Sequence, residues 1–485
     1  MPTTFPESTK VALSQSARNQ RAVRGVLSGA VGIVAALALI PIGYLLVRAS
    51  QKPLGETAQL LLRPKTLEVL ATTSALVLGV VVTTVVFGVA MATGLHFVRL
   101  PFRRLLIIPA VLPLAIPSYV FTYTWIALVP EFSGFFAAGF ILSITTLPYV
   151  ILATLSGLRT VDSSQIEVAR SLGLTLPQTF RRVVFPQVKG HISAGALLSG
   201  LYVLSDFGAV SLLNVETLTV SIQNLFKSSY DRSAASVIGL LLFLAAAIFV
   251  SLESVLKGRD FESKSAEGFQ ERIRRVNNLP LSILTTAVLA LYSLLAVVLP
   301  FYVLISRYLQ NPSAVAISDL ATAALSTISV AAMGAFIAFV LSLPLAFLAT
   351  QGTSAFASVT EKVTLMAHAL PGVVVGLSLV SFGSRLGPLY QSIFLLAFAY
   401  AVLFLAKSVA STSAALSLVS PQLKEVAATL GKSKSSVTMQ VVFPIALPNL
   451  ALGVLLVFLT AMKELPATLM LRPTGMDTLA TEIWS

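Results

Sequence analysis

Long apolar runs, separated by short polar stretches, dominate this chain of 485 residues. About 20 apolar residues in helical conformation are needed to cross the hydrocarbon core of a bilayer. Eleven segments meet that requirement, at 26–49, 67–93, 105–129, 134–158, 190–213, 235–256, 280–306, 318–350, 363–383, 388–417 and 447–471. The pattern therefore predicts an all-α polytopic membrane protein with about eleven transmembrane helices. Segment 318–350 is longer than a span requires, and we expect it to begin at the membrane interface.

The distribution of basic residues predicts the orientation. If the N-terminus is cytoplasmic, the cytoplasmic segments hold 22 of the 33 lysines and arginines, and the opposite segments hold 9. The other two, Lys407 and Lys463, lie within spans. Cytoplasmic loops usually carry the excess of positive charge, so we expect a plasma or inner membrane protein with a cytoplasmic tail at 1–25. The first span is too long for a secretory signal core and lacks a small-residue cleavage site after it.

Composition narrows the possible functions. Only 11% of the residues are charged, against about 25% in soluble domains. The absence of cysteine excludes disulfides and thiolate sites, and the three histidines are scattered, so we expect no metal site. A net charge of +13 can indicate nucleic-acid binding. Basic cytoplasmic loops account for it here, and we expect no nucleic-acid partner.

One polar stretch occurs twice. The sequence EVARSLGLTLPQTFRRVVFP (Glu167 to Pro186) returns as EVAATLGKSKSSVTMQVVFP (Glu425 to Pro444), with nine identical positions at a constant offset of 258 residues. The same offset relates Asp206 to Glu464. Two halves of one chain therefore share a fold. Because six spans separate the copies, the halves have parallel topology and a pseudo-twofold axis along the membrane normal.

These repeats define the expected domains. The first half covers 26–256 with its loop at 159–189, a cytoplasmic linker follows at 257–279, and the second half covers 280–485 with its loop at 419–446. The second half stops before an equivalent of the sixth span. We expect a twelfth helix if the chain is truncated, and truncation is the interpretation we favour.

Each loop is predicted to contain a short helix, Glu167 to Leu172 or Glu425 to Leu430. The glycine that follows suits a left-handed C-cap. Valine and leucine four residues apart form a small apolar face, which can enter a groove on a partner protein. The alternative is an amphipathic helix that lies on the membrane surface.

The loops resemble the EAA loop of ABC importer permeases, with Glu-x-Ala, Gly four residues after the Ala, and Pro thirteen residues after the Gly. Val168 and Val426 replace the alanine that is frequent in the family. The resemblance covers essentially the whole chain and implies two tandem MetI-like halves. The stretches SDFGAVSLL and KELPATLMLRP make the fused chain most similar to ferric-iron permeases; thiamine, phosphonate and polyamine permeases are related.

The resemblance implies a coupling helix in each loop that docks on an ATP-binding subunit. The residues implied in this coupling are Glu167, Ala169, Leu172, Gly173, Glu425, Ala427, Leu430 and Gly431. It also implies two ATP-binding cassette subunits, an external solute-binding protein and ferric iron as substrate. The chain itself is then no enzyme and binds no cofactor, and ATP-Mg is bound by the partner subunits.

The chain offers no convincing nucleotide site of its own. Gly431 to Ser433 imitate the end of a phosphate-binding loop, but the earlier glycine of that motif would stand at Val426. We therefore expect no catalytic residue in this chain.

Charges also occur within the predicted spans. Asp206, Lys463 and Glu464 lie about 22 Å from the cytoplasmic end of their helices, in the outer half of the bilayer. Intramembrane charges usually face an interior or a water-filled cavity. Gly208 and Pro466 follow two residues after the carboxylates, where the helices can bend. These five residues are candidates for a translocation path or gate; the alternative is a structural ion pair between Asp206 and Lys463.

Four prolines punctuate two of the spans, and we expect them to act as scaffold rather than hinge: Pro109, Pro113, Pro117 and Pro371.

Two other classes of protein fit the sequence less well. An ion-coupled secondary transporter gives no reason for two matched loop helices. A membrane-embedded enzyme would need a His, Asp or Glu cluster with catalytic spacing, which the sequence lacks.

Overall fold

The computed structural model describes residues 7–227, 231–257, 276–310, 316–350, 371–385, 387–432 and 434–484. Within these residues the regular structure is helical, apart from one isolated bridge between Val98 and Val276. Eight helices are long and apolar enough to cross a membrane, or nine if one bent pair forms a single span. The all-α polytopic fold is thus confirmed. The predicted span 363–383 and the predicted linker lie partly outside the described residues, and the count of eleven spans stays a prediction.

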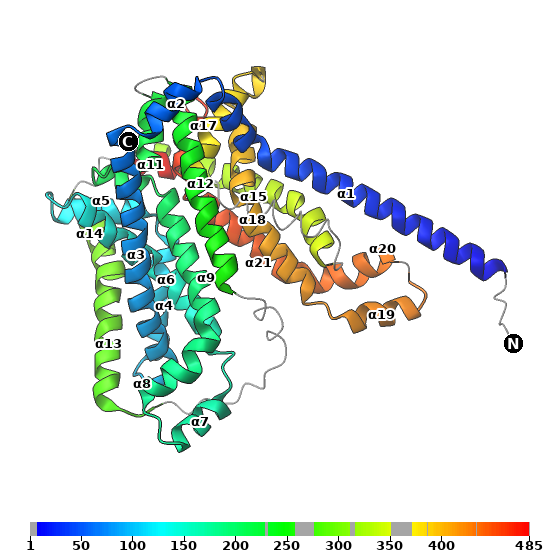
Figure 1. Ribbon diagram of the computed structural model, residues 1–485, viewed down its shortest axis with the longest axis horizontal. Coiled ribbons are helices and arrows are strands. Elements are labelled where there is room, and N and C mark those ends of the chain that lie inside the picture. The colour runs from blue at the N-terminus through cyan, green and yellow to red at the C-terminus, as the bar shows by residue number, and fades with distance from the viewer. Residues whose placement is uncertain are drawn as a thin grey trace. The chain divides into compact units, whose positions relative to one another are not determined.

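The helices of the first repeat appear in Figure 1. Their bounds are α1 Glu7–Ala49, α2 Leu54–Leu61, α3 Pro64–Phe97, α4 Arg103–Val111, α5 Ser118–Leu128, α6 Phe135–Leu158, α7 Ser163–Ser171, α8 Leu176–Thr179, α9 Phe185–Ser205, α10 Gly208–Leu212, α11 Leu218–Lys227 and α12 Arg232–Lys257. A short 3₁₀ helix at Leu112–Ala115 follows α4, and a π-helical turn at Phe180–Val184 joins α8 to α9.

The second repeat follows the same order. Its helices are α13 Leu279–Ser293, α14 Leu299–Gln310, α15 Ile317–Thr350, α17 Gly372–Gly383, α18 Ile393–Ser417, α19 Pro421–Thr429, α20 Lys434–Val437, α21 Phe443–Ala461, α22 Pro466–Leu471 and α23 Leu479–Trp484. A π-helical turn joins α13 to α14 at Leu294–Val298, and another joins α20 to α21 at Thr438–Val442.

The two repeats match element by element around the loops. With an offset of 258 residues, α7 coincides with α19, α8 with α20, and the π-helical turn before α9 with the one before α21. Helices α6 and α9 lie side by side in the first repeat, as α18 and α21 do in the second. The structure thus supports the internal repeat inferred from sequence.

One predicted span is not a single helix. The segment 105–129 forms α4 with its 3₁₀ extension and then α5, and the two parts are bent by 102°. The break lies at Ile116 and Pro117, where Ile116 is extended. A proline disfavours helical conformation in the residue before it, so the helix ends there. The segment that the prolines were expected to punctuate is therefore divided into two helices at Pro117.

The spans after the loops are broken as well. Helix α9 ends at Ser205 and α10 begins at Gly208, while α21 ends at Ala461 and α22 begins at Pro466. The predicted bends at Gly208 and Pro466 are therefore confirmed. The predicted spans 190–213 and 447–471 each consist of a long helix and a short one.

The chain divides into two compact units that exchange the first helices of the repeats. One unit contains 1–44, 325–370 and 378–476; the other contains 45–324, 371–377 and 477–485. In the former, Val31, Val34 and Ala38 of α1 pack with Leu345 and Leu348 of α15 and with α18 residues. The first helix of the first repeat therefore packs with the second repeat.

The other unit contains the reciprocal arrangement. Helix α13 packs against α3 and α4 of the first repeat, and α14 packs against α5. The Tyr292 hydroxyl on α13 donates to the Ile144 carbonyl on α6, at 3.0 Å. The first span of each sequence half thus belongs to the compact unit of the other half, and the division into halves by sequence remains a separate prediction.

Candidate functional site

The repeated loops place a capped nine-residue helix in each half. Asp162 caps α7, because its carboxylate accepts a hydrogen bond from the Ser164 amide at 2.9 Å. Ser420 stands at the equivalent position before α19, and its hydroxyl oxygen accepts from the Leu423 amide at 3.4 Å. Side-chain caps of this kind stabilise a helix N-terminus by about 1 kcal/mol, which matters for helices this short.

The C-terminal ends of both helices are closed by the predicted glycines. Gly173 has φ +86° and Gly431 has φ +78°. The Leu174 amide donates to the Ala169 carbonyl at 3.2 Å, and the Lys432 amide donates to the Ala427 carbonyl at 3.3 Å. These are the six-to-one bonds of a Schellman motif. The left-handed C-caps expected from sequence are confirmed in both copies.

The predicted apolar faces are exposed to nearly the same extent. Val168 is 58% exposed and Leu172 77%, while the equivalent Val426 and Leu430 are 56% and 76% exposed. Glu167 and Glu425 are exposed as well. Nothing else in the described part of either unit covers these four apolar side chains. Each loop therefore presents a small apolar surface, flanked by an acidic residue, on a rigidly capped helix.

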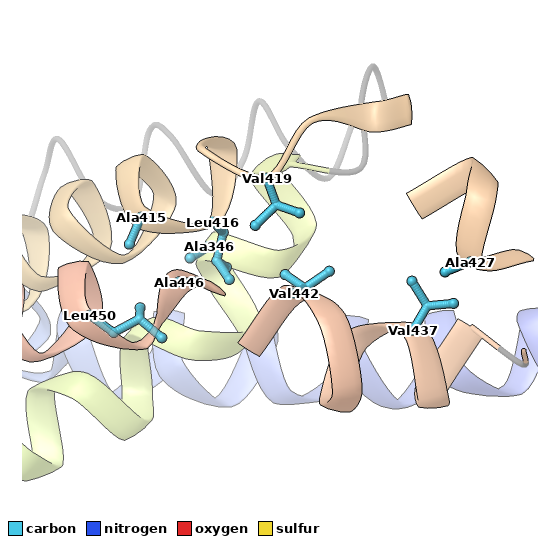
Figure 2. Packing of buried hydrophobic residues seen from close by; sticks show 9 residues of the cluster. All are labelled: Ala346, Ala415, Leu416, Val419, Ala427, Val437, Val442, Ala446 and Leu450. Carbon is cyan, nitrogen blue, oxygen red and sulfur yellow. The ribbon is translucent and has the colours of Figure 1, made fainter. Parts of the chain in front are cut away.

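The alanines of the repeated motif have a different role, which the sequence did not indicate. Ala169 is 5% exposed and Ala427 is 8% exposed. Ala427 belongs to a buried cluster with Val437 and Val442, and its methyl group lies next to Val437 in Figure 2. A larger side chain would push α19 away from α20. Alanine thus fixes the helix to the base of the loop while the opposite side stays exposed.

A π-helical turn forms this base in both copies, at Phe180–Val184 and at Thr438–Val442. Its first residue follows the short helix of the loop directly, and its last residue precedes the long membrane helix. Single π turns occur frequently at functional sites. The turn is identical in position in the two repeats, so it belongs to the loop architecture rather than to one half.

The candidate gate carboxylates both bond to the helix that follows them. The Asp206 carboxylate accepts from the amides of Ala209 at 3.0 Å and Val210 at 3.4 Å, and also from the Ser118 hydroxyl. The Glu464 carboxylate accepts from the Ala467 amide at 3.1 Å. Each acid therefore satisfies backbone donors at the break before α10 or α22. This capping role was missed, because it depends on where the long helices end.

The neighbouring gate candidates have identifiable local roles. A Cβ atom on Gly208 would lie 2.8 Å from the Cβ of Tyr119, so glycine is required where α10 approaches α5. Pro466 is the first residue of α22, where its missing amide hydrogen costs nothing. Asp206 and Lys463 belong to different compact units. Their ion pair, and the meeting of Asp206 with Glu464, stay predictions.

A further polar site distinguishes the second repeat. The Lys407 ammonium on α18 donates to the Thr460 hydroxyl on α21 at 3.3 Å and lies 5.8 Å from the Phe404 ring centre. With the offset of 258, the equivalent positions are Tyr149 and Tyr202, whose ring centres are 6.1 Å apart. Lys407 was recognised only as a charge within a span. The offset of the sequence repeat could have shown that Lys407 aligns with Tyr149.

The described residues contain no group of three or more His, Asp or Glu side chains that could hold a metal ion. The repeated loops offer exposed apolar and acidic side chains on capped helices. The membrane helices carry isolated charges that are bonded to backbone or hydroxyl groups.

Comparison with known proteins agrees with this architecture. The family described as "Binding-protein-dependent transport system inner membrane component" matches residues 84–259 and 342–484. The two matches begin 258 residues apart, which is the offset of the sequence repeat. Each match contains one repeated loop.

Among the relatives, the Fe(3+)-transport system permease protein FbpB 2 of Haemophilus influenzae is 29% identical over 450 residues, covering 92% of this chain and 89% of that protein. The sulfate transport system permease protein CysT of Salmonella typhimurium is 28% identical over 249 residues, covering 47% of this chain and 89% of its own length. The corresponding CysW protein of Escherichia coli K12 is 27% identical over 259 residues, with coverages of 49% and 89%.

The sulfate permeases thus correspond to about one repeat, whereas the ferric-iron permease corresponds to both. Three findings point to the same family. The fold is polytopic and helical, the loop with its capped helix is duplicated, and the two family matches are separated by the offset of the sequence repeat. The chain is a multi-pass inner membrane permease component, and it belongs to the family of binding-protein-dependent transport system inner membrane components.

Proposed function

We propose that this chain is the permease subunit of an ATP-driven importer, which forms the translocation pathway and couples it to separate ATPase subunits. The observation that carries the proposal is the pair of exposed apolar faces, Val168 with Leu172 and Val426 with Leu430. They lie at equivalent positions on capped helices. An ion-coupled secondary transporter has no use for two such faces.

The assembly that follows contains one chain, two ATP-binding cassette subunits and one external solute-binding protein. Each coupling helix docks on one ATPase, so both loops lie in the cytoplasm together with the N-terminus. ATP-Mg is bound by the ATPase subunits, and this chain supplies no catalytic residue.

The substrate we propose is ferric iron delivered by the binding protein. Support comes from the ferric-iron permease that matches both repeats over 92% of this chain. Thiamine, phosphonate and polyamine are the alternatives within the same class of importer. The sulfate permeases match about half of the chain, so they support the class of transporter more than the substrate.

We further propose that Asp206 and Glu464 contribute to a path or gate, together with Gly208, Lys463 and Pro466. Both carboxylates lie at a break between a long membrane helix and a short helix. Such a break exposes backbone groups inside the membrane, which is tolerated where they line protein or a water-filled cavity. Two carboxylates on a narrow path favour a cation.

The decisive experiment tests the coupling faces. Leu172→Asp and Leu430→Asp change side chains that are 77% and 76% exposed, so the permease should fold normally. We expect each single variant to weaken co-purification of the ATPase and the double variant to abolish it. The matched control is Leu54→Asp, at a residue that is 89% exposed on α2.

A double variant that retains its ATPase and full substrate-stimulated ATP hydrolysis would contradict the coupling assignment. For the substrate, the reconstituted complex is assayed for ATP hydrolysis with its binding protein and each candidate solute. Stimulation by thiamine, phosphonate or polyamine, and not by ferric iron, would replace the iron assignment without affecting the coupling proposal.

A further inference from the structure

An elongated apolar groove runs along one side of the unit that contains the first repeat. It lies between α3 and α13, with α6 as its floor, and has a cavity volume of about 590 Å³. Its lining extends from Leu76 to Met91 along α3 and from Phe135 to Leu147 along α6. At 1.5 Å per residue these stretches correspond to about 22 and 18 Å. The groove therefore follows the axes of membrane helices over much of the hydrocarbon thickness.

The divergence of two helices creates this groove. At the Gly94 end α3 and α13 are in tight contact, because a Cβ atom on Gly94 would lie 2.4 Å from the Thr285 side chain. The Ser282 hydroxyl also donates to the Arg99 carbonyl at 2.9 Å. Farther along, the Tyr292 hydroxyl joins α13 to α6 by a hydrogen bond to the Ile144 carbonyl. The groove lies between α3 and α13 in this region.

Small residues deepen the groove. Gly79 has no atom within 4 Å of the position that a Cβ would take, and at Gly139 the nearest is a Leu76 methyl carbon at 3.9 Å. Both glycines are helical and line the groove. The rims are apolar and exposed, with Phe87 at 52% and Leu291 at 57%. The groove is thus open along its length to whatever surrounds the helices.

The chemistry of the lining defines the occupant. No charged side chain lines the groove. The Thr83 and Tyr292 hydroxyls there already donate to the backbone carbonyls of Gly79 and Ile144. An uncharged space that extends for about 20 Å along the helices suits a flexible hydrocarbon chain that lies parallel to them.

We propose that the α3–α13 groove binds one acyl chain of a membrane phospholipid. The three helices that form it lie within candidate membrane spans with mean hydropathies of 2.5, 2.0 and 2.5. The acyl chain fills the gap between the first repeat and α13, the first helix of the second repeat. Packing rather than hydrophobic exclusion holds membrane helices together, so a bound chain supplies van der Waals contacts that α13 otherwise lacks.

The first test fills the groove from its floor. Gly139→Leu and Gly79→Leu place a branched side chain in open space, and Gly43→Leu on α1 is the control, because its Cβ position is also open. The full chain is purified in mild detergent, supplied with phosphatidylglycerol and analysed by native mass spectrometry. We expect wild type and Gly43→Leu to retain one phospholipid, and both groove variants to retain at least fivefold less.

The second test needs no groove variant. Trp125 packs edge-to-face on Phe140, a groove residue, with ring centres 4.9 Å apart. The chain has two tryptophans, so Trp484→Phe leaves Trp125 as the fluorescent reporter. Phosphatidylglycerol with brominated acyl chains should then quench Trp125 with a saturable component at low lipid fraction. Quenching that only rises in proportion to bulk lipid would overturn the proposal. In the first test, equal lipid retention in all variants, or retention of detergent alone, would overturn it as well.

Discussion

The repeated loops and the membrane-embedded segments differ in how closely the two repeats resemble each other. In the loops, α7 and α19 have the same bounds at the offset of 258, the glycine caps have φ +86° and +78°, and the exposed leucines differ by one percentage point. The caps and the exposed apolar faces of the two loop helices are therefore equivalent, although Arg170 is replaced by Ala428. Equivalent apolar faces support the proposed docking of one ATPase on each loop.

The membrane segments diverge at equivalent positions. Tyr149 and Tyr202 are replaced by Lys407 and Thr460, and Ser118, which donates to Asp206, is replaced by Gly376. In the proposed pathway, the two repeats contribute different walls. The comparison teaches that the repeats are most alike in their exposed loop helices and differ in the polar side chains of their membrane segments.

The largest expected effect comes from breaking the equivalent caps. Gly173→Val and Gly431→Val place a β-branched side chain in a left-handed conformation, which costs about 1–2 kcal/mol or more for each copy. Combined, they should lower transport on the order of a hundredfold, since each 1.4 kcal/mol is a factor of ten. Solute uptake by the reconstituted complex measures this effect.

Gly134→Val is the matched control, because Gly134 has φ +86° and open space around it but lies outside the loops. Equal losses in the control and the loop variants would mean that the caps contribute general stability. Full transport in the double variant would show that the loop helices need no fixed direction.

The next effect separates charge from capping in the diverged segments. Asp206→Asn and Glu464→Gln keep an oxygen that can accept from the Ala209 and Ala467 amides but remove both charges. We expect transport to fall about tenfold, corresponding to about 1.4 kcal/mol, with ATPase co-purification unchanged. Uptake and co-purification are measured on the same preparation.

Alanine variants provide the contrast, since Asp206→Ala and Glu464→Ala lose both the charge and the cap. If Asn and Gln variants transport normally while the alanine variants unfold, the carboxylates are helix caps and the gate assignment is wrong. If the Asn and Gln variants lose their assembly, a structural ion pair between Asp206 and Lys463 explains the role of the carboxylates better.

A smaller effect tests the buried side of the loops. Ala427→Leu enlarges a side chain that is 8% exposed and lies in a cluster with Val437 and Val442. Overpacking of this kind costs about 1–3 kcal/mol. Ala169→Leu should behave alike, because Ala169 is equally buried. Thermal unfolding of the purified chain measures both, and a marked difference between them would show that the loops are less equivalent than their exposed faces.

The smallest effect concerns an ion pair in the first repeat. Lys52 forms an ion pair with Asp231 at 2.9 Å, whereas Gln310 stands 258 residues after Lys52. The backbone amide of Ala234 and the Lys52 ammonium lower the pKa of Asp231. A lowered pKa stabilises the fold above the unfolded value of about 3.9, and the effect is lost as the pH falls through the folded value.

Lys52→Met should therefore reduce stability at pH 7 by less than about 1 kcal/mol, because both side chains are partly exposed. The difference from wild type should disappear once the pH falls below the lowered pKa of Asp231. Gln310→Met is the control in the second repeat and should leave stability unchanged at both pH values. A pH-independent loss in Lys52→Met would indicate lost packing of the lysine stem instead of lost charge.

Much of the candidate site followed from the sequence, because its determinants are local. The glycine C-caps depend on backbone conformation within one turn, and the exposed apolar faces depend on a spacing of four residues in a helix. The burial of Ala169 and Ala427 did not follow, because a small apolar residue in a short helix can face either side. In the second repeat, Val437 of α20 and Val442 of the π-helical turn lie on the covered side.

The capping role of Asp206 and Glu464 was also beyond the sequence. Intramembrane carboxylates indicate a functional or paired site, and their partners depend on where each long helix ends. The new helix starts at Gly208 and Pro466 leave backbone amides without intrahelical partners. Asp206 accepts from the amides of Ala209 and Val210, and Glu464 accepts from the amide of Ala467.

The sequence by itself determined the membrane class, the internal repeat at 258 residues and the chemistry of the loop helices, since hydropathy, periodicity and glycine caps act over short stretches. The tertiary structure decided the exchange of first helices, in which α1 packs with α15 and α13 packs with α3. Lipid-facing helices are apolar on all sides, and their association depends on shape complementarity between distant surfaces. Hydropathy carries no information about that complementarity.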